Sequence, residues 1–326
     1  MARRHSRNTP TERRFSAYPG CPSALPRRTR DHGARAVSSS SPVVQDSAEF
    51  EPWLVALDID GTVIHEDETL TDVVTQAVRS ARDAGHIVTL ATGRSWEMTK
   101  PILDVLELTP EYVVCANGAI TLKRDSEVET GYRRELVETF DPGPVLGRIR
   151  DGLPGGRFLV EDATGHRYFT EGMQEWNLDT ATQVEFDRLA DRPVTRVVVV
   201  SPGQEPEQFL SLIDSLGLHQ VSYAIGWTAW LDIAPDGVNK GTALERVRGI
   251  LGVPKQRVFV AGDGSNDIEM FQWAGDGGRA IAMGQAADDL KAVATEVTGT
   301  VLEDGLVTAL ESLPGFVHSI GATSVG

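Results

Sequence analysis

Short apolar runs alternate with amphipathic stretches along most of the chain, and this alternation predicts a series of strands and helices. The first predicted strands are residues 53–57, 87–91 and 112–116. Between the first two, apolar side chains recur on one helical face from Leu70 to Ala81, with Thr71 at the N-cap and Gly85 at the C-cap. A second helix is predicted to begin at Ser95. Strand–helix–strand units at this spacing favour a parallel sheet with right-handed crossovers.

The same order of elements returns near the C-terminus. A helix is predicted from Asn239 to Leu251, closed by Gly252, and a last short helix from Leu306 to Leu313. The other elements predicted there are a strand at 257–261, a helix at 265–274 and a strand at 279–283. The two ends of the chain are therefore expected to build one α/β domain.

The middle of the chain has a different order of predicted elements. Strand candidates at 158–162, 167–170, 196–200 and 221–225 are separated by helices and by turns rich in Gly and Pro. This pattern predicts a separate α+β unit inserted into the first domain. The predicted organisation is a discontinuous core at 49–133 and 231–326, and an inserted domain at 134–230.

Charge divides the chain unevenly. The net charge is −16, yet residues 1–40 contribute +7, from nine arginines against Glu12 and Asp31, so the remaining 286 residues carry −23. An acidic body makes nucleic acid an unsuitable partner, because phosphate backbones need a basic surface. Residues 1–48 lack apolar periodicity and are predicted to be a disordered basic tail. The tail is interpreted as a flexible extension of the protein, or as residues included because the start codon was assigned too far upstream. A transit peptide and a tail that binds an acidic surface remain alternatives.

Other global features place the chain among ordinary globular proteins. Hydrophobic residues make up 40% and charged residues 24%, and no apolar run reaches the roughly 18 residues that cross a bilayer. Only Cys21 and Cys115 occur, far apart, which argues against a disulfide framework and suits the cytoplasm. No membrane partner is expected, and the oligomeric state is left open.

Polar clusters follow directly after several predicted strands. They are Asp58 and Asp60, Thr92-Gly93-Arg94, Asn117-Gly118, and the stretch 262–267 that contains Asp263, Asn266 and Asp267. Ligands of parallel sheets bind beyond the carboxyl ends of the strands, so these clusters are expected at one rim of the sheet. Asn239-Lys240-Gly241 begins a helix that reaches the same side.

The residue types in these clusters indicate phosphoryl transfer. Four carboxylates, of Asp58, Asp60, Asp263 and Asp267, are predicted to share a small volume with Lys240. A hard divalent cation relieves their repulsion, and ligands that are all oxygen suit Mg²⁺. Hydroxyl, glycine N–H and ammonium groups suit a phosphate. A metal, a phosphate site and a free carboxylate together indicate an aspartyl-phosphate intermediate.

The chain resembles the haloacid dehalogenase-like (HAD) phosphatases in four motifs that occur in the family's order. The motifs are DIDGT at 58–62, TGR at 92–94, KG at 240–241 and GDGSND at 262–267. Asn117-Gly118-Ala119 and the long insertion before the lysine resemble the Cof-like subgroup. That resemblance implies a Rossmann-like parallel-sheet core with an inserted type-IIB cap domain, and it covers roughly residues 53–313.

The resemblance also implies the roles of the acidic residues. Asp58 would be the nucleophile. Asp60 would protonate the leaving oxygen and then activate water, and its backbone carbonyl would touch the metal. Asp58, Asp60 and Asp263 would form the Mg²⁺ site.

The remaining site residues follow from the same resemblance. Thr92, Gly93, Lys240 and Asn266 would bind the transferring phosphoryl group. Three residues are expected in support of the site, namely Asp267, Arg94 and Asn117. All three have simpler interpretations, since Arg94 also suits a surface ion pair, Asn117 a left-handed turn and Asp267 an acidic residue in the first turn of a helix.

These features predict a Mg²⁺-dependent phosphomonoesterase that hydrolyses a small phosphorylated metabolite, such as a sugar phosphate. Two alternatives stay open. One is a sugar phosphomutase or a dedicated sugar-phosphate phosphatase of the same superfamily. The other is a non-catalytic sensor of phosphorylated ligands that has kept the scaffold. The substrate itself depends on contacts of the insertion that one sequence does not reveal.

Overall fold

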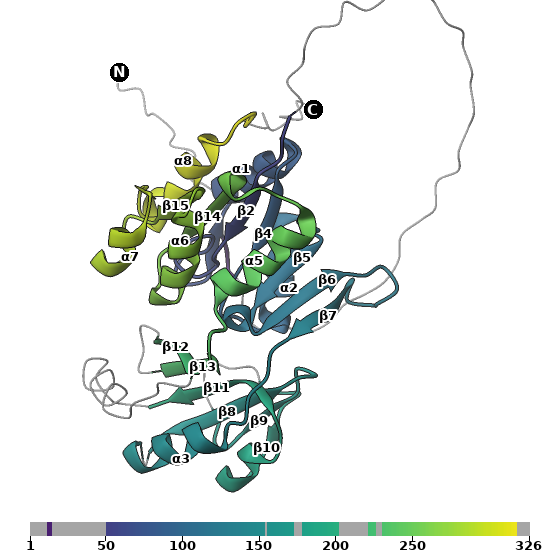
Figure 1. Cartoon of the computed structure of the whole chain (residues 1–326), viewed down its shortest axis with the longest axis vertical. Coiled ribbons are helices and arrows are strands. Elements are labelled where there is room, and N and C mark those ends of the chain that lie inside the picture. The colour runs from purple at the N-terminus through teal and green to yellow at the C-terminus, as the bar shows by residue number, and fades with distance from the viewer. Residues whose placement is uncertain are drawn as a thin grey trace, which may run out of the picture.

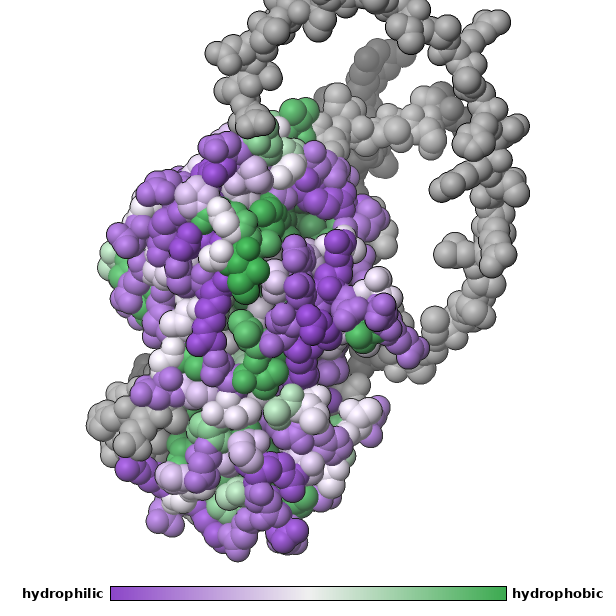
Figure 2. Space-filling view, turned by 45° about the vertical axis from the view of Figure 1, so that its right-hand side comes forward, coloured by the Kyte–Doolittle hydropathy of each residue, from purple (hydrophilic) through white to green (hydrophobic). Residues whose placement is uncertain are grey.

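The structure is a computed structural model that describes residues 12–14, 50–153, 155–172, 178–201, 221–225 and 230–317. Two lobes contain the described elements, with the N- and C-terminal parts of the chain in one and the insertion in the other (Figure 1). Figure 2 shows polar residues over much of one face of the molecule, with apolar residues gathered in a band over the upper lobe. None of the helices in the described part combines the length and the apolar character needed to span a membrane.

A parallel sheet of five strands forms the centre of the larger lobe. Its strand order is β16 (Glu296–Val297), β15 (Arg279–Ala282), β14 (Val258–Gly262), β2 (Leu54–Leu57) and β4 (Ile87–Leu90). Every residue of β2 is buried, which explains why this strand has no polar position. The predicted parallel sheet is therefore confirmed, with β2 between β14 and β4.

Helices cover both faces of this sheet. One face carries α1 (Asp72–Asp83), α2 (Trp96–Leu106) and α8 (Gly305–Glu311), and the other α5 (Lys240–Leu251), α6 (Ile268–Gly275) and α7 (Asp288–Val293). Side chains of β2 alternate between these two cores, with Val55 and Leu57 in the first and Ala56 in the second. The Thr71 side chain caps α1 by accepting from Val74 N, as the sequence predicted.

The third predicted strand, β5 (Tyr112–Cys115), lies mainly in a different sheet from the one expected. It pairs antiparallel with β6 (Ile120–Arg124), which pairs in turn with β7 (Tyr132–Val137). Only an isolated bridge between Ala91 and Val114 continues the parallel order. The reason is the short connection after β5, a single turn of 3₁₀ helix η1 (Ala116–Gly118), because a connection this short joins only antiparallel strands.

The smaller lobe is a mixed sheet of six strands. Their order is β10 (Thr182–Gln183), β9 (Arg167–Phe169), β8 (Arg157–Asp162), β11 (Val194–Val200), β13 (Trp230–Pro235) and β12 (Val221–Ile225). All pairs are antiparallel except β9 with β10. Helix α3 (Gly143–Gly152) and the 3₁₀ turn η2 (Phe186–Ala190) pack on one face of this inserted sheet. The insertion therefore has the α+β character that the sequence predicted, and the exact domain boundaries stay predictions.

Several short elements complete the described chain. They are β1 (Glu12–Arg14), β3 (Thr69–Thr71), η3 (Lys255–Arg257), η4 (Ser265–Asp267) and η5 (Val301–Glu303). β1 belongs to the segment predicted as a disordered tail, and the sequence did not predict its antiparallel pairing with β3. The rest of that tail lies outside the described residues.

The η1 turn needs a glycine at its end. Ala116, Asn117 and Gly118 all have positive φ, and that of Gly118 is 99°. A Cβ added to Gly118 would lie 2.2 Å from the backbone oxygen of Asn239, a contact too short for the two segments to keep their places. This glycine therefore lets the η1 turn lie directly against the start of α5.

We predict that Gly118→Ala lowers the free energy of unfolding by more than about 1 kcal/mol, because the new methyl group meets backbone and the backbone has positive φ. Urea unfolding of both proteins would measure the loss. Gly147→Ala is the control, since this exposed glycine of α3 has open space around it and alanine favours helix by roughly 0.5–1 kcal/mol. Equal stability of Gly118→Ala and the parent protein would contradict the prediction.

Candidate active site

Asp58 stands at the carboxyl end of the central strand. β2 ends at Leu57, and the backbone N–H of Asp58 donates to the oxygen of Ala261 on β14 at 2.9 Å. The residue is only 4% exposed. The sheet thus delivers a carboxylate to its rim and keeps it out of bulk water.

Lys240 is the first residue of α5, and its side chain is fully buried. Asn239 fixes the helix start through a capping box with Thr242. The Lys240 Nζ lies 2.7 Å from Asp58 Oδ1 and 2.7 Å from Asp267 Oδ1. One ammonium group therefore joins carboxylates from two strand ends.

Asp267 uses both carboxylate oxygens within the protein. Its Oδ1 accepts from Lys240, and its Oδ2 accepts from the backbone N–H groups of Asp263 and Gly264, at 3.1 Å each. Asp263 makes looser contacts, accepting from Thr62 Oγ1 at 3.3 Å. Asp267 is therefore suited to hold the loop and the lysine, and Asp263 has more capacity for a ligand.

Three buried carboxylates form a candidate metal group. Oxygens of Asp58, Asp263 and Asp267 lie within 4.8 Å of one another. The carboxylates can lie this close together because two nearby glycines have no side chain. A Cβ at Gly61, whose φ is 70°, would lie 2.1 Å from Asp263 Oδ2, and one at Gly262 would lie 2.3 Å from Asp267 Oδ2. The glycines of the DIDGT and GDGSND motifs thus make room for the acidic side chains.

The site carries more negative charge than Lys240 neutralises. Burial raises the pKa of Asp58 well above its usual value against the opposing effect of Lys240, and burial raises that of Asp263 to about 7. Although burial acts to lower it, the pKa of Lys240 is raised by Asp267 and Asp58, so the lysine stays charged. A buried all-oxygen donor set with excess negative charge fits a hard divalent cation.

Asp60 departs from the prediction that four carboxylates gather in one small volume. Its side chain is 58% exposed and accepts two hydrogen bonds from Arg94, from Nε at 3.0 Å and Nη2 at 2.6 Å. The extended strand ends at Leu57, so the spacing of two residues no longer aligns Asp60 with Asp58. Arg94 also reaches Glu68 at 3.4 Å and has a raised pKa, since Asp60 and Glu68 outweigh its burial.

The predicted phosphate residues lie along the same rim. Thr92 is fully buried, and its Oγ1 accepts from the backbone N–H of Arg94 at 3.0 Å. Asn117 adopts the left-handed conformation and places its Oδ1 3.0 Å from Asn266 Nδ2. The structure thus brings Thr92, Asn117 and Asn266 together. The phosphate contacts of Thr92 and Asn266 and the supporting role of Asn117 stay predictions.

Sequence reasoning missed Gln285. Its Nε2 donates to Asp263 Oδ2 at 3.2 Å and to the backbone oxygen of Gly61 at 2.6 Å. The residue follows β15, so the same strand-end rule that found the other clusters could have found it. It ties the first and last acidic loops of the site to each other.

Sequence reasoning also missed two charged residues of the inserted sheet, Arg196 and Asp232. Both are almost fully buried. Arg196 Nη1 donates to the oxygen of Gly93 at 2.8 Å, and Asp232 Oδ2 accepts from Asn117 at 2.9 Å. The available signal was a single charged residue beside apolar ones inside each strand, in RVVVV and in LDI.

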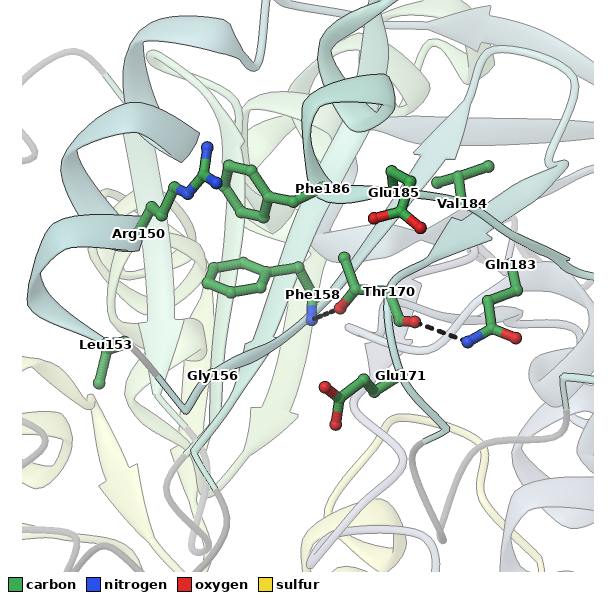
Figure 3. Close-up of a pocket in the computed structure, with 10 residues that line it drawn as sticks. All are labelled: Arg150, Leu153, Gly156, Phe158, Thr170, Glu171, Gln183, Val184, Glu185 and Phe186. Carbon is green, nitrogen blue, oxygen red and sulfur yellow. Dashed lines mark hydrogen bonds between the residues drawn. The ribbon is translucent and has the colours of Figure 1, made fainter.

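A separate cavity of about 800 Å³ lies in the inserted domain, away from these residues (Figure 3). Phe158 and Phe186 pack edge to face in it, with the Arg150 guanidinium over the Phe186 ring. Gln183 Nε2 donates to the oxygen of Thr170 at 2.9 Å (Figure 3). No residue predicted for the active site lines this cavity.

A parallel sheet with a buried lysine and carboxylates at its rim, together with an inserted mixed sheet, defines an α/β protein with an inserted cap domain. The sequence profile of the haloacid dehalogenase-like hydrolases matches residues 55–139 and 156–310, and the chain belongs to that family. It is a HAD-family phosphatase of the Cof-like subclass IIB, as the sequence motifs indicated.

Curated relatives align over nearly their whole length. The 5-amino-6-(5-phospho-D-ribitylamino)uracil phosphatase YitU of Bacillus subtilis is 27% identical over 271 residues, which cover 81% of this chain and 98% of YitU. The pyridoxal phosphate phosphatase YbhA of Escherichia coli is 29% identical over 280 residues, covering 79% and 97%. The structure of the HAD subclass IIB sugar phosphatase BT4131 superposes with a TM-score of 0.65 at 19% identity, covering 79% of this chain and 98% of that one, which shows the same fold.

We predict that Lys240→Met lowers the free energy of unfolding by about 3–5 kcal/mol near neutral pH, because it leaves Asp58 and Asp267 buried without a cation. The loss should shrink as the pH falls, since burial raises the pKa of Asp58 and protonation of this carboxylate removes its charge. Urea unfolding of both proteins at neutral and at mildly acidic pH would measure it.

Lys100→Met is the matched control, because Lys100 forms an i,i+4 pair with Asp104 on the outside of α2. Its effect should stay below about 0.5 kcal/mol at both pH values. A Lys240→Met loss that is small, or that does not depend on pH, would show that the ammonium does not neutralise the site.

Proposed function

We propose that this chain is a Mg²⁺-dependent phosphomonoesterase that hydrolyses a small phosphorylated metabolite through an aspartyl-phosphate intermediate. The observation that carries the proposal is Lys240, buried 2.7 Å from both Asp58 and Asp267 beside the Asp263 carboxylate. YitU and YbhA are named for substrates that are phosphate esters of small molecules, which supports the same class of substrate here.

Asp58 is the proposed nucleophile. Among the described residues only Lys240 donates to its side chain, through Oδ1, so Oδ2 is available to attack phosphorus. A bond then forms between this oxygen and phosphorus, while the bond from phosphorus to the ester oxygen breaks. The ammonium group of Lys240 offsets the charge that the entering phosphoryl group brings next to Asp58.

Asp60 is the proposed acid and base. It gives a proton to the departing ester oxygen, and it later takes a proton from the water that cleaves the phosphoaspartate. Its exposed position at the mouth of the site suits contact with both the leaving group and water. The two hydrogen bonds from Arg94 fix the orientation of the carboxylate.

Thr92, Gly93, Lys240 and Asn266 are the proposed ligands of the phosphoryl oxygens. Asp58, Asp263 and the backbone carbonyl of Asp60 would hold Mg²⁺, which supplies positive charge to the phosphoryl oxygens when it is bound. Asp267 is the proposed support of Lys240 and of the Asp263 loop, since both of its oxygens already accept hydrogen bonds.

Turnover of p-nitrophenyl phosphate with Mg²⁺ tests the proposal directly. We predict that Asp58→Asn lowers kcat by on the order of 10³-fold or more, because an amide does not attack phosphorus. Asp276→Asn, at an exposed aspartate after α6, is the control and should retain full activity. Full activity of Asp58→Asn would refute the mechanism, and binding of phosphate esters without phosphate release would indicate a sensor.

A metal-dependence experiment tests the cation site. We predict that chelation by EDTA abolishes turnover, that added Mg²⁺ restores it, and that Asp263→Asn raises the Mg²⁺ concentration needed for half-maximal activity at least about tenfold. Asp267→Asn is the informative comparison, because its expected effect is on stability and kcat more than on the Mg²⁺ requirement. Turnover that persists in EDTA would contradict a metal-dependent reaction.

Product analysis separates hydrolysis from the mutase alternative. A panel with hexose phosphates, pyridoxal phosphate and a ribitylaminouracil phosphate should release inorganic phosphate from at least one member. An isomeric hexose phosphate in place of free phosphate would indicate a mutase.

A further inference from the structure

The inserted sheet turns a charged row of side chains toward the core. In β11, Val197 and Val199 pack under α3, whereas Val198 belongs to the opposite face. Because side chains alternate along a strand, Arg196 lies on the Val198 face. Asp232 of β13 is directly opposite Val198 in the register and shares this face. A buried arginine and a buried aspartate therefore stand where the sheet meets the core.

Arg196 bridges the two domains. Its Nη1 donates to the backbone oxygen of Gly93 at 2.8 Å and lies 3.5 Å from Asp232 Oδ2, and its Nε lies 3.3 Å from Glu161 Oε2. The Arg196 side chain is 2% exposed and that of Glu161 is fully buried. Groups this deeply buried lose solvation, so they are held only where their partners are fixed.

Asp232 contacts a second segment of the core, the η1 turn. Its Oδ2 accepts from Asn117 Nδ2 at 2.9 Å, and Asn117 Oδ1 accepts from Asn266 Nδ2 at 3.0 Å. This chain of two hydrogen bonds leads from the inserted sheet, through the η1 turn, into the GDGSND loop. The backbone of β12 also lies against the η4 turn of that loop.

Asn117 is joined to the other segments of the predicted phosphate site as well. Its backbone N–H donates to the oxygen of Thr92 at 3.0 Å, and its Oδ1 lies 3.1 Å from where a Cβ of Gly93 would be. The next residue, Gly118, packs against the backbone of Asn239, directly before Lys240. The TGR loop, the start of α5 and the GDGSND loop thus all meet at the η1 turn.

We propose that Asp232 and Arg196 are positioning residues for phosphoryl transfer. From the inserted sheet they hold Asn117 and Gly93 in the places where the phosphoryl group is bound. The phosphate site is then complete only while the inserted sheet lies against the core. This inference rests on the proposed function of the same site. It assigns Asp232 and Arg196 to the binding of the phosphoryl group and not to the binding of the leaving group.

The test measures the KM for p-nitrophenyl phosphate, which involves turnover, and the Kd for inorganic phosphate, which does not. For Asp232→Ala we expect the KM for p-nitrophenyl phosphate and the Kd for inorganic phosphate to rise together by about 10- to 100-fold, because Asn117 loses a buried acceptor. Asp232→Asn keeps an oxygen that can accept from Asn117, so it should recover most of the affinity. Asp187→Ala, at an exposed aspartate of η2 paired with Arg150, is the control and should match the parent protein.

Calorimetric binding of inorganic phosphate separates this inference from the proposed function. If the parent protein binds phosphate but does not hydrolyse esters, the proposed function fails while the effect of Asp232 on phosphate affinity is still measured. Asn117→Ala approaches the same contact from the core. Its effect should not add to that of Asp232→Ala, since the two substitutions break one hydrogen bond. This second variant also serves where Asp232→Ala does not fold.

Two outcomes would overturn the inference. One is unchanged KM and phosphate Kd in folded Asp232→Ala or in folded Asn117→Ala. The other is a lower melting temperature with unchanged phosphate affinity, which would show that the contact only stabilises the packing of the two domains.

Discussion

The pairing of a single buried ammonium with two carboxylates constrains the rest of this structure. Lys240 has no exposed surface, and an unpaired charge at that depth is strongly unfavourable. Asp58 must therefore lie at the end of β2 and Asp267 at the start of α6, each 2.7 Å from the ammonium. Residues 58, 240 and 267 come from widely separated parts of the chain, so the pairing forms only when the parallel sheet closes around it.

Glycines and backbone amides let this charged centre exist inside a packed core. Gly61 and Gly262 leave space that any side chain would fill, and the N–H groups of Asp263 and Gly264 satisfy the second oxygen of Asp267. Even so, the negative charge exceeds the positive charge, and burial together with the nearby Asp267 carboxylate raises the pKa of Asp263 to about 7. The same imbalance that opposes folding of the bare site suits the site to a bound cation.

The sequence was sufficient for features that depend on local pattern. The apolar strands, the cap at Thr71 and the order of the motifs predicted the parallel sheet and the rim where Asp58, Lys240 and Asp263 meet. It was insufficient where tertiary contacts decide. Asp60 faces solvent and pairs with Arg94 because the extended strand ends at Leu57. β5 joins a second sheet because η1 is short, and Asp232 becomes important only through Asn117. A charged residue inside an apolar strand marks a buried partner, but the pattern does not say which one.

The route of the chain joins the inserted domain to the rim of the core sheet in two ways. Asp232 on β13 contacts Asn117, and the same strand runs directly into the segment that places Lys240 at the start of α5, eight residues further along. β11 and β13 carry Arg196 and Asp232, and β12 lies against the η4 turn, while β8, β9 and β10 lie progressively farther along the sheet. Glu161 of β8 still contacts Arg196, so β9 and β10 are the strands farthest from the charges that contact the core. A fold organised in this way can keep one reaction and vary the molecule from which the phosphate is removed.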